Sequence, residues 1–176
     1  MITLRRDFRL GKNVILNFCG LDDYDISAVR EMRNHSLIRK WMYSRKIVGP
    51  REHLSFFSGL KDKTNDFYWL VKASGVYIGV IYLNRLDRKN RHAYLGIYAN
   101  PLLPIKDKGF QLLQCLKYIG FTKAGLKTIK LEVFEDNMKA IVFYRKNGFK
   151  TEGRLRAFVL SGRDWKDVLI MGLTRS

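Results

Sequence analysis

A tyrosine and an asparagine in residues 136–149, DNMKAIVFYRKNGF, have the spacing of two groups that act together. Asp136 or Asn137 can cap a helix there, and Gly148 can end it. Seven helical residues make about two turns, so Asn137 and Tyr144 would project in line, roughly 10 Å apart. A tyrosine hydroxyl has an ordinary pKa near 10 and can donate a proton at neutral pH. A helical tyrosine taken alone, however, is more often a core residue.

The loop PIKDKGFQ has the composition of an anion site. It follows a strand that ends in Ala99-Asn100 and precedes a helix, whose free backbone N–H groups and positive end favour a phosphate. Lys106 and Lys108 add charge. An ordinary strand-to-helix connection is the alternative. Neither a GxGxxG nor a Walker A motif is present, so nothing indicates a dinucleotide fold or a P-loop.

The elements that position these residues follow from hydrophobic periodicity. We expect strands at residues 14–18, 67–73, 76–83, 92–100, 128–136, 149–160 and 165–173. We expect helices at residues 24–34, 37–42, 50–61, 111–125 and 137–148, with Phe143 anchoring the last one on the sheet. The order strand, loop, helix, strand, helix in the middle implies a crossover with parallel pairing, and the ends look like antiparallel hairpins. The sequence thus predicts an α/β fold.

Length and composition favour one globular domain over residues 1–176. No apolar run is long enough to span a bilayer, and the N-terminus lacks a secretory pattern, so we expect a cytoplasmic protein. Two cysteines without a CxxC motif argue against a disulfide framework or a zinc site. The net charge of +17 predicts an attraction to polyanions, through either a solvated basic surface or a dedicated anion site.

The C-terminal motif resembles that of the GNAT family of acetyl-CoA-dependent N-acetyltransferases. It reads D-N-x-x-A-x-x-F-Y-x-K-x-G-F, and the order of elements matches over nearly the whole chain. The resemblance implies a mixed central sheet of about seven strands with helices on both faces, acetyl-CoA as co-substrate and no metal. The chain departs from the family at Gln111, where a small residue usually ends the pyrophosphate loop.

The resemblance also implies roles for individual residues. Tyr144 would be the general acid that protonates the departing thiolate. Backbone N–H groups near Ile97 would hold the acetyl carbonyl. The residues implied to bind the cofactor are Ile97, Tyr98, Ala99, Lys106, Lys108, Gly109, Phe110, Asn137, Tyr144 and Lys146.

Glu132 is the candidate general base. Strand alternation puts Lys130, Glu132 and Phe134 on one face and the apolar residues between them on the other. A carboxylate in mid-strand is costly to bury without partners, so we expect Glu132 to face a wet cleft and to deprotonate an amine through water. The alternative is a structural glutamate paired with a neighbouring Arg or Lys.

A narrower resemblance is to the sugar-nucleotide N-acetyltransferases of the pseudaminic acid pathway. It covers roughly residues 24–170, and R-N-H followed by W-M-Y-S is its most specific part. It implies a UDP-4-amino sugar as substrate, with Arg33 near the diphosphate, because a guanidinium pairs well with phosphate oxygens. The residues implied to bind this substrate are Arg33, Met42, Tyr43, His53, Phe56 and Tyr94. Structural roles in the core or on the surface are the alternative for Met42, His53 and Phe56.

Other functions stay open at this point. A GNAT enzyme that acetylates a ribosomal-protein N-terminus would explain the positive charge, but not the Trp-Met-Tyr segment. Polyamines are cationic and fit a +17 protein poorly. A nucleic-acid-binding module is disfavoured because the basic residues are dispersed and no recognition motif is present, so we expect no stable nucleic-acid partner. The sequence leaves the oligomeric state open, with a homodimer as one assembly.

Overall fold

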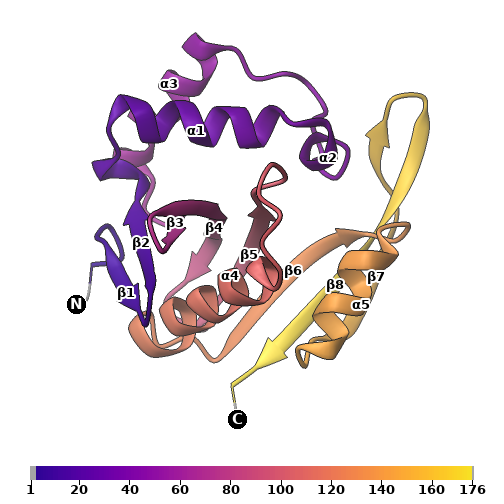
Figure 1. The fold of residues 1–176 in the computed structure, drawn as a ribbon. Helices are drawn as coiled ribbons and strands as arrows, with labels where there is room; N and C mark the ends of the chain where they lie inside the picture. Colours follow the sequence, from indigo (N-terminus) through magenta and orange to yellow (C-terminus); the bar gives the residue numbers. More distant parts are fainter. Residues whose placement is uncertain (1–2, 176) are drawn as a thin grey trace.

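The computed structural model describes residues 3–175, which form one sheet covered by helices (Figure 1). The helices are α1 (Asp23–Asn34), α2 (Ser36–Arg39), α3 (Pro50–Gly59), α4 (Lys108–Lys117) and α5 (Met138–Lys146). The strands are β1 (Phe8–Leu10), β2 (Asn13–Asn17), β3 (Phe67–Ala73), β4 (Val76–Asp87), β5 (His92–Ala99), β6 (Thr128–Phe134), β7 (Lys150–Ser161) and β8 (Asp164–Thr174). Within this part of the chain, no helix is long and apolar enough to cross a membrane.

The sheet is mixed, as expected, and has eight strands in the order β1-β2-β3-β4-β5-β6-β8-β7. The pairing of β5 with β6 is parallel, whereas β3 with β4 and β7 with β8 are antiparallel hairpins. The predicted number of about seven strands was too low by one, because β1 was missed. This strand has three residues in a basic segment, too short to show an alternating pattern, and a turn at Gly11 (φ +55°) pairs it with β2.

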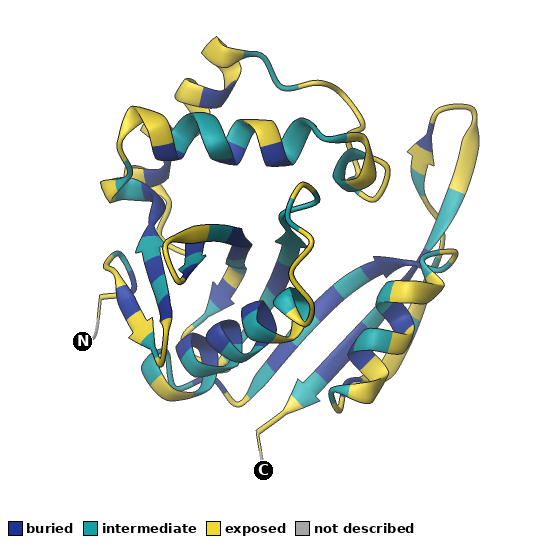
Figure 2. Ribbon diagram, viewed as in Figure 1, coloured by how far each residue is buried: buried dark blue, intermediate teal, exposed yellow. Residues whose placement is uncertain are grey.

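Helices cover both faces of the sheet, which confirms the predicted architecture. Alternate strand residues point into two cores, as the side-chain period of two requires. Leu70 and Val80 pack against α1 and α3, while Trp69 and Ile81 belong to the larger core beneath α4 and α5. The inward sides of these helices are buried and their outer sides are exposed (Figure 2).

The strands β5 and β6 diverge after a short parallel contact. Residues 92–94 pair with residues 128–130, and beyond them β5 continues along β4 while β6 continues along β8. In the described part of the chain, the edge of β5 from Leu95 to Ala99 therefore has no neighbouring strand on its β6 side. This divergence opens the sheet at its centre and leaves backbone groups of β5 free to bind a ligand.

The two helices beside this opening are capped largely as predicted. The Asn137 side chain accepts a hydrogen bond from the Ala140 amide (3.3 Å), and Gly148 ends α5 with φ +91°. The helix α4 begins at Lys108, three residues earlier than predicted, and continues as a wider π-helical turn over Tyr118–Lys123. Gly125 ends this turn with φ +66°, as the sequence indicated.

The prediction that Phe143 anchors α5 on the sheet was right only in part. Ile141 and Tyr144 are the buried residues of this helix, whereas Phe143 is only partly buried against the same core. The Phe143 ring lies instead near the start of α4, where a Cβ at Gly109 would be 3.8 Å from it. The helix is rotated so that its hydroxyl-bearing aromatic faces inward, toward the divergent strands.

A substitution at Gly79 tests how tightly β4, β5 and α4 pack. Gly79 has φ +152°, and an added Cβ would lie 2.4 Å from the Tyr98 carbonyl oxygen and 2.7 Å from Leu112 Cδ1. We expect Gly79→Ala to lower the free energy of unfolding by about 3 kcal/mol, through overpacking and backbone strain. Urea unfolding measures it, with Gly59→Ala as control, because no atom lies within 4 Å of a Cβ there. Equal stability of the two variants would contradict the prediction.

Candidate active site

A cleft of about 270 Å³ occupies the opening between β5 and β6. Of the predicted cofactor residues, Ile97, Tyr98, Ala99, Asn137 and Tyr144 line this cleft. The cleft also meets the free edge of β5, so backbone N–H and C=O groups can bind an extended amide-containing chain. The pantetheine arm of coenzyme A is such a chain.

Tyr144 lies at the inner wall of the cleft. Its side chain is 9% exposed and packs edge-to-face on Phe143 and Phe149, with ring centroids 5.3 and 5.4 Å away. Burial raises the pKa of the hydroxyl above its ordinary value, and the nearby Tyr82 adds to this effect. The hydroxyl therefore stays protonated at neutral and moderately alkaline pH, as a proton donor must.

The predicted phosphate loop leads into the first turn of α4. Asp107 precedes the helix in a left-handed conformation (φ +59°) and makes no side-chain cap, so the first backbone N–H groups of α4 stay available to an anion. Gly109 lies in this first turn, and Lys106 and Phe110 are exposed beside it. Lys146 is exposed at the end of α5.

Lys108 is the exception among the basic residues of this loop. Its ammonium group donates to the carbonyl oxygens of Asn100 and Leu103, which closes the loop between β5 and α4. Burial lowers the pKa of this amine, and the positive charge of Lys139 adds to the effect. In this structure Lys108 holds the loop together, so Lys106 is the more available cation for a phosphate.

Glu132 sits where the cleft meets a second cavity. Both of its carboxylate oxygens have partners: Tyr43 donates to Oε2 (2.7 Å), and Arg85 pairs with Oε1 (2.8 Å). Its side chain is 14% exposed and lines both cavities. Glu132 therefore borders a cleft, as expected, and is also paired with an arginine, which was the alternative.

The second cavity, of about 350 Å³, brings together residues from five segments, among them Arg85 from β4. Arg33 comes from α1, Met42 and Tyr43 from the loop after α2, Tyr94 from β5 and Glu132 from β6. Helix α2 ends at Arg39, so Met42 lies in this loop and not in the predicted helix over residues 37–42. The lining carries two cationic side chains, Arg33 and Arg85, against the single carboxylate of Glu132.

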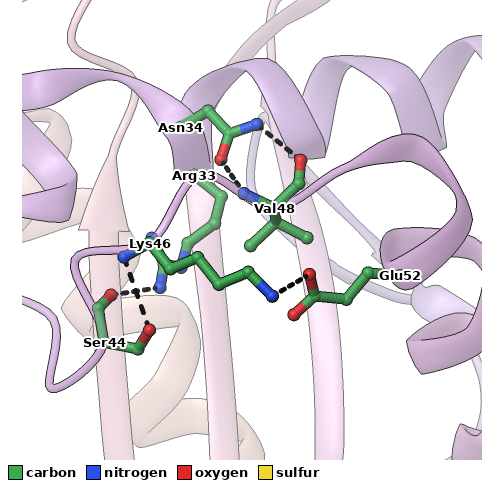
Figure 3. A network of polar contacts seen from close by, with 6 residues as sticks. All are labelled: Arg33, Asn34, Ser44, Lys46, Val48 and Glu52. Carbon is green, nitrogen blue, oxygen red and sulfur yellow. Dashed lines mark hydrogen bonds and ion pairs between the residues drawn. The ribbon is translucent and has the colours of Figure 1, made fainter.

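The loop after α2 is held by a polar network (Figure 3). Asn34 pairs with both backbone groups of Val48, at 2.8 and 2.9 Å, and Lys46 forms an ion pair with Glu52 (3.1 Å). Arg33 Nη2 donates to the Ser44 carbonyl (3.0 Å), whereas Arg33 Nη1 is buried and has no hydrogen-bond partner among residues 3–175. These contacts keep the loop over the site and leave one guanidinium nitrogen in need of an acceptor.

A third cavity, of about 280 Å³, lies on the other side of Arg33 and Met42. The predicted substrate residues His53 and Phe56 line it. His53 Nε2 lies 3.0 Å from the Ile26 carbonyl and so carries the proton. Burial lowers the pKa of this imidazole, so it is neutral at pH 7 and cannot supply charge to a phosphate. His53 thus joins α3 to α1 in addition to lining the cavity.

Several lining residues were missed by the sequence analysis. Tyr82 lines all three cavities, and its ring lies over Gly96, where a Cβ would be 1.8 Å from the Tyr82 Cζ. Arg85 was missed because the predicted strand ended at residue 83, whereas β4 extends to Asp87. Other missed lining residues include Trp41, Asn84 and Tyr68. Only Gly96, in the β5 sequence YLGIY, gave a hint of these residues in the sequence, because a glycine in a strand lets another side chain approach the backbone closely.

Metal ligation has no candidate among residues 3–175, where no three His, Cys, Asp or Glu side chains are grouped closely enough to hold an ion. The expectation that no metal takes part in the reaction stays a prediction. The roles given to the individual site residues also stay predictions, although their positions are now fixed.

Comparisons with solved structures agree on the fold. A spermidine N-acetyltransferase from Vibrio cholerae, solved in complex with CoA and spermine, superimposes with a TM-score of 0.84 at 20% identity, over 94% of this chain and 96% of that one. The N-acetyltransferase PseH of Campylobacter jejuni superimposes with a TM-score of 0.69 at 22% identity, over 94% and 99% of the two chains. At these identities the likeness concerns the fold alone.

Sequence comparisons extend the likeness beyond the fold. The acetyltransferase PseH of Campylobacter jejuni serotype O:2 is 33% identical over 133 residues, which make up 76% of this chain and 82% of that protein. A spermidine N(1)-acetyltransferase of Escherichia coli K12 is 26% identical over 148 residues, or 81% and 77% of the two chains. The profile of the Acetyltransferase (GNAT) family matches residues 28–149, so the chain belongs to the GNAT family of N-acetyltransferases, which use acetyl-CoA.

Proposed function

We propose that this N-acetyltransferase acts on a nucleotide-linked amino sugar. The acceptor would be the 4-amino group of UDP-4-amino-4,6-dideoxy-N-acetyl-β-L-altrosamine, in pseudaminic acid biosynthesis for flagellin glycosylation. One observation carries the choice: the cavity that meets the acetyl-CoA cleft at Glu132 is lined by Arg33 and Arg85 against one carboxylate. A net positive lining suits an amine that is attached to a diphosphate.

The aromatic walls of the two outer cavities support the same substrate class. Tyr94 and Tyr43 border the cavity at Glu132, while Phe56 and Tyr68 border the cavity beyond Arg33. A 6-deoxy, N-acetylated sugar and a uracil ring both present apolar faces that pack on aromatic side chains. Arg33 lines both cavities and would meet the diphosphate between them, which would give the buried Nη1 an acceptor.

The proposed reaction is a direct transfer. The free amine attacks the thioester carbonyl, whose oxygen is stabilised by backbone N–H groups along the free edge of β5. Glu132 takes the amine proton, directly or through water, as the carbon–sulfur bond breaks. Tyr144 gives its proton to the departing sulfur. Glu132 then releases its proton to solvent, and Tyr144 recovers one from solvent through the cleft. The products are the acetamido sugar and free coenzyme A.

A polyamine acceptor is the second candidate. Its support is the spermidine N(1)-acetyltransferase of Escherichia coli K12, which is 26% identical over 148 residues. The lining charge disfavours it, since the carboxylate of Glu132 is already paired with Arg85. An acceptor on a ribosomal-protein N-terminus is the other alternative, and the net charge of +17 is its main support.

A substrate panel tests the proposal. The purified protein is mixed with acetyl-CoA and, in separate reactions, with UDP-4-amino-4,6-dideoxy sugars, spermidine, spermine and basic N-terminal peptides, and free thiol release is followed. Turnover with a UDP-4-amino sugar at a kcat/KM above that of every other amine is expected. Turnover with polyamines or peptides but with no amino sugar would refute the proposal.

Replacing Arg33 tests the assignment of the diphosphate. We expect Arg33→Ala to raise the KM for the UDP-sugar about tenfold to a hundredfold, because a charge-assisted pair with phosphate is lost, and to leave the KM for acetyl-CoA unaltered. Steady-state kinetics with each substrate varied in turn measures both constants. Arg45→Ala is the control, since this exposed arginine lies in the same loop region but lines none of the three cavities. A parallel rise of both constants would make Arg33 structural.

A further inference from the structure

The backbone of Arg85 has an unfavourable conformation that neighbouring residues must stabilise. It lies in a register shift between β4 and β5, bounded by Asn84 and Asp87, and has φ +51°. A residue other than glycine in this region is strained unless its surroundings hold it. The carboxylate of Asp66, just before β3, accepts a hydrogen bond from the Arg85 amide (3.1 Å) and supplies that support.

The irregular backbone aims the Arg85 side chain across the sheet at Glu132. The guanidinium carbon lies 3.7 Å from the centroid of the Tyr94 ring, and Nη2 lies 2.8 Å from Glu132 Oε1. The side chain is 58% exposed and lines the cavity of about 350 Å³, so its charge faces the space where an acceptor amine would lie. Stacking on Tyr94 and pairing with Glu132 together fix one orientation of the guanidinium.

From this arrangement we infer that Arg85 is a specificity-determining residue that excludes polycationic amines from the acceptor site. The inference rests on the proposed function of that site and adds the residue that sets the charge class of the acceptor. Arg85 holds the one carboxylate of the cavity lining that an ammonium group would otherwise use. A polyamine must therefore displace a guanidinium from Glu132 before it gains a favourable partner.

The same charge favours the reactive form of the acceptor. A cation near an amine disfavours its protonation, so Arg85 and Arg33 together increase the fraction of bound acceptor that is neutral and nucleophilic. A nucleotide-linked amino sugar bears one amino group, and the negative charge of its diphosphate compensates for the positive charge of the lining. Spermidine bears several ammonium groups and no anion, so it meets only the repulsion.

The orientation of Glu132 does not depend on Arg85 alone. Tyr43 donates to Oε2 and is itself held between two aromatic rings, those of Phe134 and Phe158, at 5.6 and 6.3 Å. Removal of the Arg85 charge thus leaves a second hydrogen bond on the carboxylate. The effect of charge can be measured with the position of Glu132 largely retained.

The test compares spermidine binding to Arg85→Gln and to a matched control, Arg88→Gln. Arg88 is exposed in the turn after β4 and lines none of the three cavities, so both variants lose one unit of charge and only one changes the site. We expect Arg85→Gln to bind spermidine about tenfold to a hundredfold more tightly than Arg88→Gln in calorimetry at low salt. The difference should shrink as salt is raised, because screening weakens charge interactions in an open cavity.

Further variants separate charge from packing. Arg85→Lys keeps the cation and should bind spermidine as weakly as the unaltered protein. If Arg85→Gln does not fold, Arg85→Met keeps an unbranched chain over Tyr94 and takes its place in the same titration. Equal spermidine affinity in the Arg85 and Arg88 variants would overturn the inference.

The proposed function is tested separately by turnover. Failure of the unaltered protein to acetylate any UDP-4-amino sugar would refute the sugar substrate, while the spermidine titration would still decide the role of Arg85. Conversely, the protein could acetylate a UDP-4-amino sugar while its spermidine affinity stayed the same after replacement of Arg85. That result would support the proposed function and refute the role of Arg85.

Discussion

Replacing Tyr144 with phenylalanine is expected to lower kcat by about 10²- to 10⁴-fold, the range for removal of a general acid, and to leave acetyl-CoA affinity nearly unchanged. The ring would keep its contacts with Phe143 and Phe149, so the change removes one hydroxyl and little packing. Single-turnover rates measure the chemical step, and a titration with coenzyme A measures binding. An unchanged rate of the chemical step would show that the leaving thiolate takes its proton elsewhere.

The pH dependence of kcat provides a second test of this role. Burial raises the pKa of Tyr144, and a raised pKa keeps the acid protonated to higher pH. Loss of activity through ionisation of this tyrosine should therefore begin only above its ordinary value near 10. A decline of kcat that starts below pH 9 and disappears in Tyr144→Phe would contradict the assignment.

Glu132→Gln should cause the second large loss, about 10²-fold in kcat/KM for the acceptor, because the amide cannot take a proton from the amine. The glutamine keeps nearly the shape of the glutamate and can still accept the hydrogen bond from Tyr43. The loss should be smaller at high pH, where more of the free amine forms without a base. Profiles of kcat/KM against pH for the two proteins measure this difference.

Glu152→Gln is the matched control for Glu132→Gln. Glu152 lies on β7 and pairs with Lys130 (2.9 Å), so it is also a strand glutamate in an ion pair with a basic residue, but it lines none of the three cavities. We expect nearly unaltered kinetics in this variant. A similar loss in both variants would mean that ion pairs across the strands matter for stability and that Glu132 is not a base.

The order of helices and strands was predictable because its signals are local. Periodicity, helix caps and the glycines at 125 and 148 depend on neighbours in the chain, and they gave seven strands, five helices and the parallel crossover. Elements without such signals were missed or misplaced. The strand β1 has only three residues, too few to show an alternation of apolar and polar side chains. The extension of β4 to Asp87 lies in a register shift, where this alternation is interrupted.

The site residues were predictable where they belong to a sequence motif of the family. Tyr144 and Asn137 line the cleft. The predicted substrate residues each line at least one of the two cavities beyond it: Arg33, Met42, Tyr43, His53, Phe56 and Tyr94. The chemical state of these residues was not predictable. Lys108 is taken up by loop carbonyls, and His53 is tied to Ile26, because burial and partners decide whether a charged group is free.

The sequence by itself thus determined the family, the order of elements and the positions of the proposed acid and the proposed base. Only the tertiary structure decided which charges surround the acceptor. Arg85 meets Glu132 across 47 residues of chain, and Tyr43 meets it across 89. Such contacts depend on how the loop after α2 and the irregular end of β4 fold over the divergent strands. No local pattern encodes them, because the energy of an ion pair depends on distance in space and on burial.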